Sequence, residues 1–226
     1  MTSAPDGTWV VVPVYNEAQS LGAIIERVHA AGMRCLVVDD GSTDDTVAVA
    51  AAAHIDHVVH HSRNLGYSMA LRAGLQEAAS RPDCRWVVSI DGDGQLDPFE
   101  AATLAVEAES AGVGVAVGVR PTHARRSERF AAWLLSRLFG ISDPLCGLKV
   151  YRVEIIKRFA DACGRRVGME LAICAARDGV GLLQREISTR PSRRHGSRYG
   201  RGLKAELRIV AATLMLASLA LRGARS

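Results

Sequence analysis

The sequence lacks several features that would point away from a soluble α/β domain. Its five cysteines are scattered and form no C-x-x-C pair, which favours reduced thiols in a cytosolic core. No basic segment with an apolar run precedes the first predicted strand, so we expect no signal peptide. The longest later apolar stretch, Ile209–Leu221, would span about 20 Å as a helix, short of the roughly 30 Å of a bilayer core.

No linker, repeat or low-complexity block divides the 226 residues, so we predict one domain. Hydrophobic residues make up 48% of the chain, which excludes a disordered protein. The net charge of +4 is unevenly spread, because the segment from Arg190 to Arg208 holds six Arg, one Lys and one Glu. A local excess of this size indicates a polyanionic partner: a phosphate, an anionic lipid surface or a nucleic acid.

Short apolar runs alternate with helical patterns through the first half of the chain. Strands are predicted over residues 9–14, 35–38, 57–59, 86–90 and 113–119, and helices between them. This alternation predicts a mostly parallel, Rossmann-like sheet flanked by helices on both faces. In the less regular second half, Phe130, Trp133, Leu134 and Leu138 share one helical face, and an amphipathic helix ends the chain. We interpret the shared face as core packing, with the bilayer interface as the alternative because Arg-rich segments adjoin it.

Three polar segments follow predicted strands and should meet at one edge of the sheet. One of them, Asp91-Gly92-Asp93-Gly94-Gln95, combines two carboxylates with glycines that let a backbone approach a ligand. Carboxylate oxygens suit Mg²⁺ or Mn²⁺ held together with substrate phosphates. Taken alone, the same residues could be a simple Asp/Gly turn.

The other two segments are residues 39–46 and residues 12–17. Asp39 or Asp40 could accept hydrogen bonds from a nucleobase or a ribose, although helix capping explains part of this segment. Tyr15, Asn16 and Glu17 end the first strand with polar groups that face the same crevice.

The three segments, in this order and near these spacings, resemble the family 2 glycosyltransferases, which have the GT-A fold. Residues 64–70, 143–152 and 193–200 are similar to the dolichyl- or polyprenyl-phosphate hexosyltransferase branch of that family. The sequence departs from the usual branch pattern at Cys146, where Ser is common, and at Leu148-Lys149, where an aromatic residue and Arg are usual.

This resemblance implies a donor site in residues 1–120. It assigns nucleotide-sugar contacts to Pro13, Tyr15, Glu17, Asp40 and Asp91, and to Arg194 and Arg198 from the basic segment. It assigns a Mg²⁺ or Mn²⁺ ion to Asp91, Asp93 and Gln95. His195, in the same basic segment, is interpreted as an ordinary loop residue rather than a metal ligand.

The resemblance also implies an acceptor site in residues 121–226, beginning at a basic loop. Arg120, Arg129, Ser136 and Arg137 would bind the acceptor phosphate, and Asp91, Asp93 and Arg120 would be catalytic. The implied reaction moves mannose or glucose, with inversion, from GDP-mannose or UDP-glucose to a polyprenyl or dolichyl monophosphate. Such an enzyme would lie peripherally on the cytoplasmic face of a membrane, with or without an anchoring subunit, and would not need nucleic acid.

Three alternatives remain open from the sequence. A family 2 enzyme acting on a saccharide hydroxyl would need a carboxylate base, for which Asp143 is the candidate. A nucleotidyltransferase would typically need a glycine-rich loop after the first strand, and residues 13–17 contain no glycine. A nucleic-acid-binding protein would use the basic segment, with a steep dependence of affinity on salt.

Overall fold

The computed structural model describes residues 3–122, 125–164, 166–190 and 202–221. Seven strands form one sheet in the order β3-β2-β1-β4-β6-β5-β7. The strands are β1 (Thr8–Val14), β2 (Arg34–Asp39), β3 (His57–His60), β4 (Trp86–Ser89), β5 (Val115–Val119), β6 (Lys149–Arg152) and β7 (Leu182–Glu186). All neighbouring pairs are parallel except the two made by β6, which confirms the predicted mostly parallel sheet.

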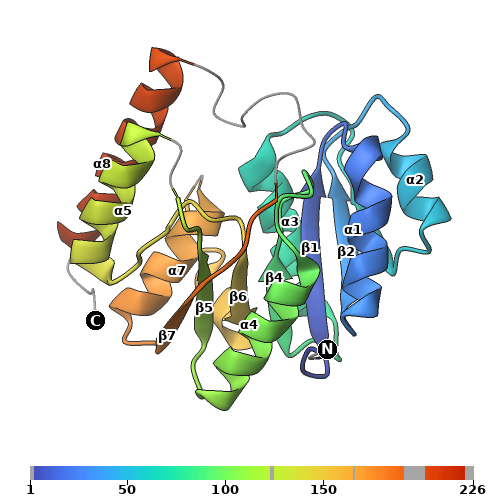
Figure 1. Ribbon diagram of the computed structural model, residues 1–226, viewed down its shortest axis with the longest axis horizontal. Helices are drawn as coiled ribbons and strands as arrows, with labels where there is room; N and C mark the ends of the chain where they lie inside the picture. Colours follow the sequence, from blue (N-terminus) through green and yellow to red (C-terminus); the bar gives the residue numbers. More distant parts are fainter. Residues whose placement is uncertain (1–2, 123–124, 165, 191–201, 222–226) are drawn as a thin grey trace.

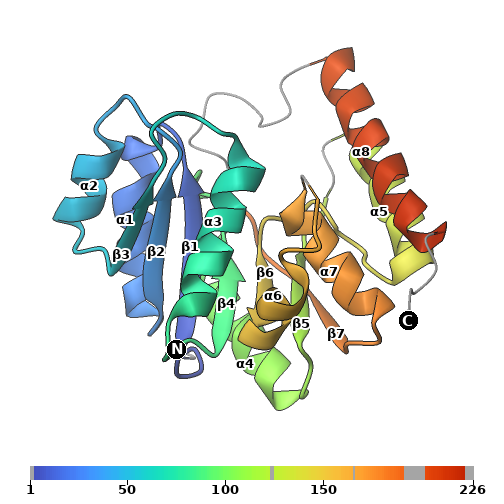
Figure 2. The ribbon, with the colours of Figure 1, turned by 180° about the vertical axis from the view of Figure 1, so that it is seen from behind.

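Helices cover both faces of this sheet (Figures 1 and 2). They are α1 (Ala18–Ala30), α2 (Thr46–Ala52), α3 (Tyr67–Ser80), α4 (Pro98–Ser110), α5 (Arg126–Phe139), α6 (Val153–Phe159), α7 (Val167–Arg177) and α8 (Leu203–Leu221). Helices α1, α2 and α4 contribute to one buried apolar cluster, and α3, α6 and α7 contribute to a second. The predicted α/β architecture of the GT-A type is therefore present.

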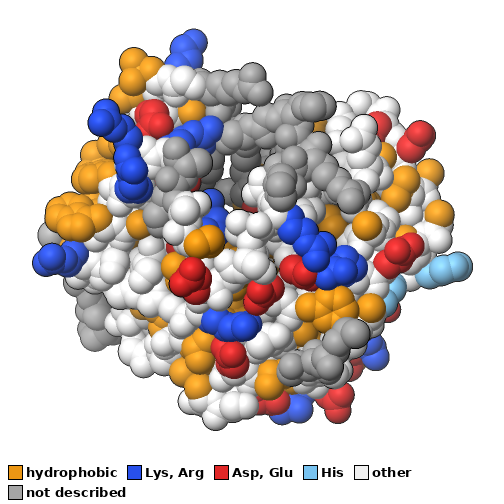
Figure 3. All heavy atoms as spheres, in the orientation of Figure 1, with side chains coloured by type: hydrophobic (Ala, Val, Ile, Leu, Met, Phe, Trp, Pro, Cys, Tyr) orange, Lys and Arg blue, Asp and Glu red, His pale blue; other side chains and the backbone are white. Residues whose placement is uncertain are grey.

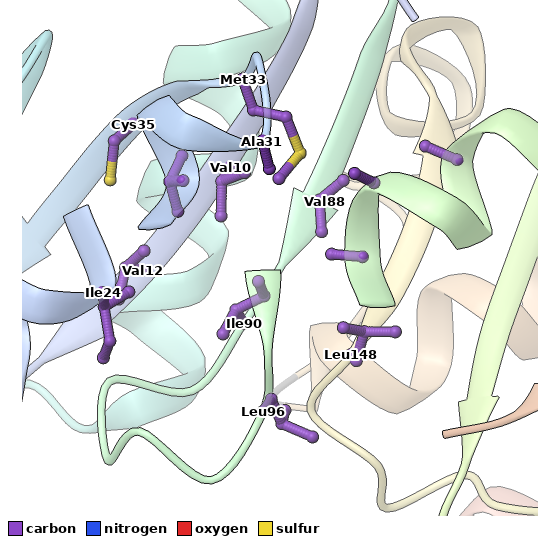
Figure 4. Close-up of a cluster of buried hydrophobic side chains, with 14 of the residues drawn as sticks. Val10, Val12, Ile24, Ala31, Met33, Cys35, Val88, Ile90, Leu96 and Leu148 are labelled. Atoms are coloured by element: carbon purple, nitrogen blue, oxygen red, sulfur yellow. The ribbon is translucent and has the colours of Figure 1, made fainter. Parts of the chain in front are cut away.

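The two clusters follow from the strand sequences. Every residue of β1 is buried, and its alternate side chains pack on opposite faces, so that Val10 and Val12 belong to the first cluster and Val11 to the second. Figure 4 shows the first cluster, where Ile90 and Leu96 from the chain after β4 lie with these valines. All five cysteines are free and four of them are buried in the clusters; burial raises the pKa of the Cys146 thiol to about 11.

Helices α5 and α8 lie side by side, next to α7 and away from the centre of the sheet (Figures 1 and 2). Helix α8 buries Ile209, Ala212 and Leu216 and exposes Leu203 and Leu207, which confirms the predicted amphipathic C-terminal helix. No helix in the described part of the chain is long and apolar enough to cross a membrane.

The interpretation of the α5 apolar face as core packing was wrong for half of its residues. Trp133 is 57% exposed and Leu138 is 42% exposed, whereas Phe130 and Leu134 are only partly buried. Helix α5 packs against α8 rather than against the sheet, so one neighbouring helix cannot cover its whole apolar face.

Candidate active site

The three polar segments meet in one pocket at the carboxyl ends of β1, β2 and β4, as predicted. Its lining includes Pro13, Tyr15, Glu17, Asp40, Asn64, Tyr67, Asp91 and Asp93. Each of β1, β2 and β4 ends where its chain turns toward a helix, and parallel strands bring these ends to the same edge. The pocket thus combines residues from positions about 80 apart in the chain.

Glycines allow the pocket walls to close on one another. A Cβ atom on Gly92 would lie 2.8 Å from Val14 Cγ1 and 3.1 Å from the Pro13 carbonyl, so only glycine fits beside β1. Gly41 has a φ of +77°, and a Cβ atom there would lie 2.7 Å from the Arg63 carbonyl carbon. Ser20 Oγ donates a hydrogen bond of 2.7 Å to the Gly92 carbonyl and holds this loop on α1.

Asp91 and Asp93 lie on the pocket wall in different surroundings. Tyr67 Oη donates to Asp91 Oδ1 at 2.9 Å, and a Cβ atom on Gly147 would lie only 2.5 Å from Asp91 Cγ. Asp93 Oδ1 accepts a hydrogen bond from Gln95 N at 3.1 Å, which tightens the turn between them. The hydrogen bond from Tyr67 and the close approach of Gly147 therefore both restrict the position of the Asp91 carboxylate.

This pair of carboxylates fits a divalent cation of the Mg²⁺ or Mn²⁺ type. Within the described residues no group of three or more His, Cys, Asp or Glu side chains is placed to enclose a metal. An ion of this type usually keeps waters and takes substrate phosphates beside one or two carboxylates, so two oxygen donors facing a pocket suffice. Gln95 is not among the residues that line the pocket, and its role as a third ligand stays a prediction.

Asp40 is buried and its carboxylate is used to build the pocket. It accepts hydrogen bonds from Leu65 N at 2.9 Å and Gly66 N at 2.8 Å, and His61 Nδ1 lies 2.7 Å from its Oδ1. Asp40 therefore fixes the chain that leads into Tyr67 at the start of α3. A carboxylate oxygen has two lone pairs, so Oδ2 can still accept a hydrogen bond from a ligand in the pocket.

Hydrogen bonds hold residues 12–17 and residues 39–46 together. They use Ser42 and Thr46, from the segment in which helix capping was expected. Asn16 has a φ of +55°. Its side-chain Oδ1 accepts a hydrogen bond from Thr43 N at 2.8 Å, and its backbone N–H donates to Ser42 Oγ at 3.0 Å. Glu17 N donates to Thr46 Oγ1 at 2.9 Å. These contacts hold the loop after β2 against the residues that carry Tyr15 and Glu17.

Arg120 is held by Asp143, the residue considered as a catalytic base. Arg120 Nε and Nη2 donate to the two Asp143 oxygens at 2.7 and 2.9 Å, and Arg120 N donates to Oδ2 at 3.1 Å. Asp143 is 1% exposed. Burial alone would lower the pKa of Arg120, but the hydrogen bonds and charge of Asp143 raise it. A buried carboxylate engaged in this way is a poor proton acceptor for a substrate hydroxyl.

The predicted acceptor residues are placed unevenly. Arg129 is exposed in the first turn of α5, whereas Ser136 and Arg137 are in its last turn, about 10 Å farther along the helix axis. None of these three is among the residues that line the pocket of Asp91 and Asp93. Arg194, His195 and Arg198 lie outside the described residues.

Tyr67 and Lys149 lie in segments that carry the family resemblance, residues 64–70 and 143–152, but the sequence analysis assigned no role to either residue. Tyr67 lines both this pocket and an adjacent smaller one that reaches Lys149 and Arg166. Lys149 is 3% exposed and donates to the Cys146 carbonyl; burial lowers the pKa of its ammonium group, against the opposing charges of Cys146, Asp143 and Asp91. A lone Tyr or Lys in an apolar segment gives no local signal of such a position.

Comparison with known proteins agrees with this geometry. The family model described as glycosyl transferase family 2 matches residues 9–159. The chain belongs to glycosyl transferase family 2. This family 2 chain is 31% identical over 204 residues to the polyprenol monophosphomannose synthase of Mycolicibacterium smegmatis, a match that covers 80% of this chain and 76% of that protein.

Two further proteins similar to this family 2 chain are both longer than it. The dodecaprenyl-phosphate galacturonate synthase of Rhizobium johnstonii is 34% identical over 171 residues, which are 66% of this chain and 48% of that protein. The chain thus spans about half the length of that relative. Glucosyl-3-phosphoglycerate synthase from Mycobacterium tuberculosis, in complex with Mn²⁺, UDP and glucosyl-3-phosphoglycerate, superposes with a TM-score of 0.72 at 25% identity, over 94% of this chain and 80% of that one.

Proposed function

We propose that this protein transfers a sugar from a nucleotide diphosphate sugar to a polyprenyl monophosphate, with inversion at the anomeric carbon. The observation that carries the proposal is the pocket that joins Asp40, Asp91 and Asp93 at the carboxyl ends of three parallel strands. Such a pocket suits a nucleotide at the β1–β2 side and its diphosphate at the Asp93 side. Mannose or glucose as the sugar stays a prediction.

The relatives support a polyprenyl phosphate as the acceptor. Two of them, which are 31% and 34% identical to this chain, are named for the transfer of mannose and galacturonate to such lipids. The chemistry of the acceptor and the surroundings of Asp143 support the same proposal. A phosphate monoester has a second pKa near 6 and is largely dianionic at neutral pH, so its oxygen attacks without a general base. Asp143, the candidate for the base that a hydroxyl acceptor would require, is buried against Arg120.

The reaction then needs the two anionic substrates to be held in line. A phosphate oxygen of the acceptor forms the new bond to the anomeric carbon, and the bond to the nucleotide diphosphate breaks on the opposite face. Asp91 and Asp93 would hold a Mg²⁺ or Mn²⁺ ion, which supplies positive charge to the leaving diphosphate. Tyr67 orients the Asp91 carboxylate. Arg120 is paired with Asp143 and is not among the residues that line the pocket, so its contact with the acceptor phosphate stays a prediction.

We also propose that helices α5 and α8 attach the protein peripherally to a bilayer. Their exposed apolar side chains include Trp133, Leu203, Leu207 and Leu214, and exposed basic side chains lie among them. Figure 3 shows hydrophobic and Lys or Arg side chains interspersed along the side of the molecule formed by these helices. A mixed apolar and basic surface suits the headgroup region of an anionic membrane. The cytoplasmic face and an anchoring subunit stay predictions.

A direct assay tests the proposed function. The purified chain is incubated with Mn²⁺ or Mg²⁺, a short polyprenyl phosphate and a panel of UDP- and GDP-sugars, and the lipid product is identified by mass. We expect a glycosyl polyprenyl phosphate, which Asp93→Asn should abolish while Asp6→Asn, an exposed carboxylate outside the pocket, has no effect. Transfer to sugar or glycerate hydroxyls but never to the lipid phosphate would contradict the proposal.

A further inference from the structure

Asp97 joins three parts of the chain that surround the donor pocket without lining it. It ends the loop after β4 and caps α4, accepting a hydrogen bond from Phe99 N at 3.1 Å. Arg27 Nη2, from the last turn of α1, donates to both carboxylate oxygens at 2.6 and 2.7 Å. Arg190, which follows β7, donates to Asp97 Oδ2 at 2.7 Å. One carboxylate therefore connects α1, the start of α4 and the chain after β7.

The chain after β7 runs along the loop that carries Asp91 and Asp93. Leu96 and Thr189 form an isolated antiparallel bridge, and Arg190 N donates to the Gln95 carbonyl at 2.9 Å. Leu96 is 5% exposed and belongs to the apolar cluster of Figure 4. The loop is thus anchored immediately after Gln95, both by burial and by pairing with residues 189–190.

Helix capping does not account for this arrangement. An Asn or Ser at position 97 could cap α4 as well as Asp does, but it would leave two arginines from separate elements without their shared counter-charge. Burial would raise the pKa of Asp97, yet the hydrogen bonds and charge of Arg27, together with Phe99 N and Arg190, lower it. Asp97 is therefore an anion at neutral pH, 16% exposed at its side chain, between two cations.

We propose that Asp97, Arg27 and Arg190 form a latch that fixes the Asp91–Gln95 loop against α1 and the chain after β7, and so positions the carboxylates of that loop for binding the donor diphosphate. The inference rests on the proposed function and adds positioning residues to it. Asp97 is four residues from Asp93, and Arg190 N donates to the carbonyl of Gln95 in the same loop. Loss of the latch would therefore allow the loop that carries Asp91 and Asp93 to shift in the pocket.

The test measures binding of Mn²⁺-UDP and Mn²⁺-GDP by isothermal titration calorimetry, without any acceptor. Asp97→Asn keeps the cap but removes the charge, and Arg190→Gln removes one arm of the latch. We expect each to weaken nucleotide binding about tenfold, roughly the effect of one charge-assisted hydrogen bond. Arg185→Gln is the matched control, because Arg185 lies on β7 and pairs with Glu100 and Glu107 but not with Asp97; it should bind like the unaltered protein.

Two further measurements separate positioning from general destabilisation. The Asp97→Asn/Arg190→Gln double variant should bind about as weakly as Asp97→Asn alone, because Asp97→Asn already breaks the ion pair with Arg190. In Arg190→Gln, hydrogen exchange without nucleotide should become faster in residues 93–97 and in residues 187–190 together. In the control Arg185→Gln, exchange in both segments should equal that of the unaltered protein.

Additive losses in the double variant, or unchanged binding and exchange in Arg190→Gln, would overturn the latch. Failure of the unaltered protein to bind either nucleotide would overturn the proposed function, and with it the role of the latch in donor binding. In that case, faster exchange of residues 93–97 and 187–190 together in Arg190→Gln would show that the latch exists and that only the assigned ligand is wrong.

Discussion

At the scale of single residues, a side chain can act in the site through a single hydrogen bond. Tyr67 Oη donates to Asp91, whereas the hydroxyl of Tyr151, which is 1% exposed, has no hydrogen-bond partner among the described residues. Tyr67 lines the pocket at the start of α3, whereas Tyr151 is a core residue of β6. They offer a matched pair for separating catalytic geometry from stability.

Tyr67→Phe should lower kcat/KM for the donor about tenfold, because a hydrogen bond to a charged group contributes about 1.5 kcal/mol or more and fixes the Asp91 rotamer. Tyr151→Phe should leave activity unchanged and keep or raise the free energy of unfolding by about 1 kcal/mol, since it removes a buried unpaired hydroxyl. Steady-state kinetics and urea unfolding measure both effects. Equal activity in the two variants would remove Tyr67 from the site.

Gly147→Ala should abolish most of the activity. The added methyl carbon would lie 2.5 Å from Asp91 Cγ, so the carboxylate must move, and a displacement of about 1 Å costs roughly 100-fold in rate. Gly22→Ala is the control, because the added methyl on α1 would lie at an ordinary contact distance, 3.4 Å, from Val49 Cγ1. This substitution inside a helix should raise the free energy of unfolding by up to about 1 kcal/mol. Activity and thermal unfolding of both variants give the comparison; full activity of Gly147→Ala would show that Asp91 is not constrained there.

At the scale of secondary-structure elements, α5 and α8 differ from the other helices. The helices on the sheet bury their apolar stripes in the two clusters, but α5 and α8 mainly cover each other and leave Trp133 and Leu207 more than half exposed. Helix α5 packs mainly against α8 and to a smaller extent against α7, which leaves apolar surface of both α5 and α8 uncovered. A bilayer interface would cover this remainder.

The Trp133→Ser/Leu207→Ser double variant should bind anionic vesicles at least tenfold more weakly than the unaltered protein. Burial of one such side chain contributes about 1.5–3 kcal/mol when complete, so loss of two partly inserted groups is measurable. Sedimentation with phosphatidylcholine–phosphatidylglycerol vesicles measures binding. Val47→Ser, which removes an exposed apolar side chain on α2, is the control. Equal binding by all three proteins would place any membrane contact elsewhere.

At the scale of the whole molecule, the two predicted halves are interleaved in the sheet. Strand β6 from the second half pairs with β4, and β5 from the first half has only β6 and β7 as neighbours. The donor and acceptor halves are therefore regions of one sheet, and neither has a complete set of strand partners.

A fragment of residues 1–120 should fail to fold independently. It contains β5 without either of its neighbours and lacks the α6 and α7 side chains that complete the second apolar cluster. Circular dichroism and hydrogen exchange of this fragment should show loss of cooperative unfolding, whereas the whole chain should unfold in one transition. A fragment with a sharp transition and nucleotide binding of its own would contradict the single-domain prediction.

Much of this arrangement could be predicted from the sequence. Buried strands such as 9–14 and 86–90 have local patterns, and parallel strands bring their carboxyl ends to one edge whatever their order. The meeting of Tyr15, Asp40 and Asp91 therefore followed from local patterns and one rule of sheet geometry.

Contacts between distant segments required the tertiary structure. The pairing of Arg120 with Asp143, the placement of Tyr67 on Asp91 and the convergence of Arg27 and Arg190 on Asp97 join residues 23 to 93 positions apart. No local period encodes which arginine meets which carboxylate, because that choice depends on the strand order and on the packing of loops against one another. The sequence by itself determined where ligand-binding groups gather, and the packed fold decided which of them remain available to a ligand and which hold the site together.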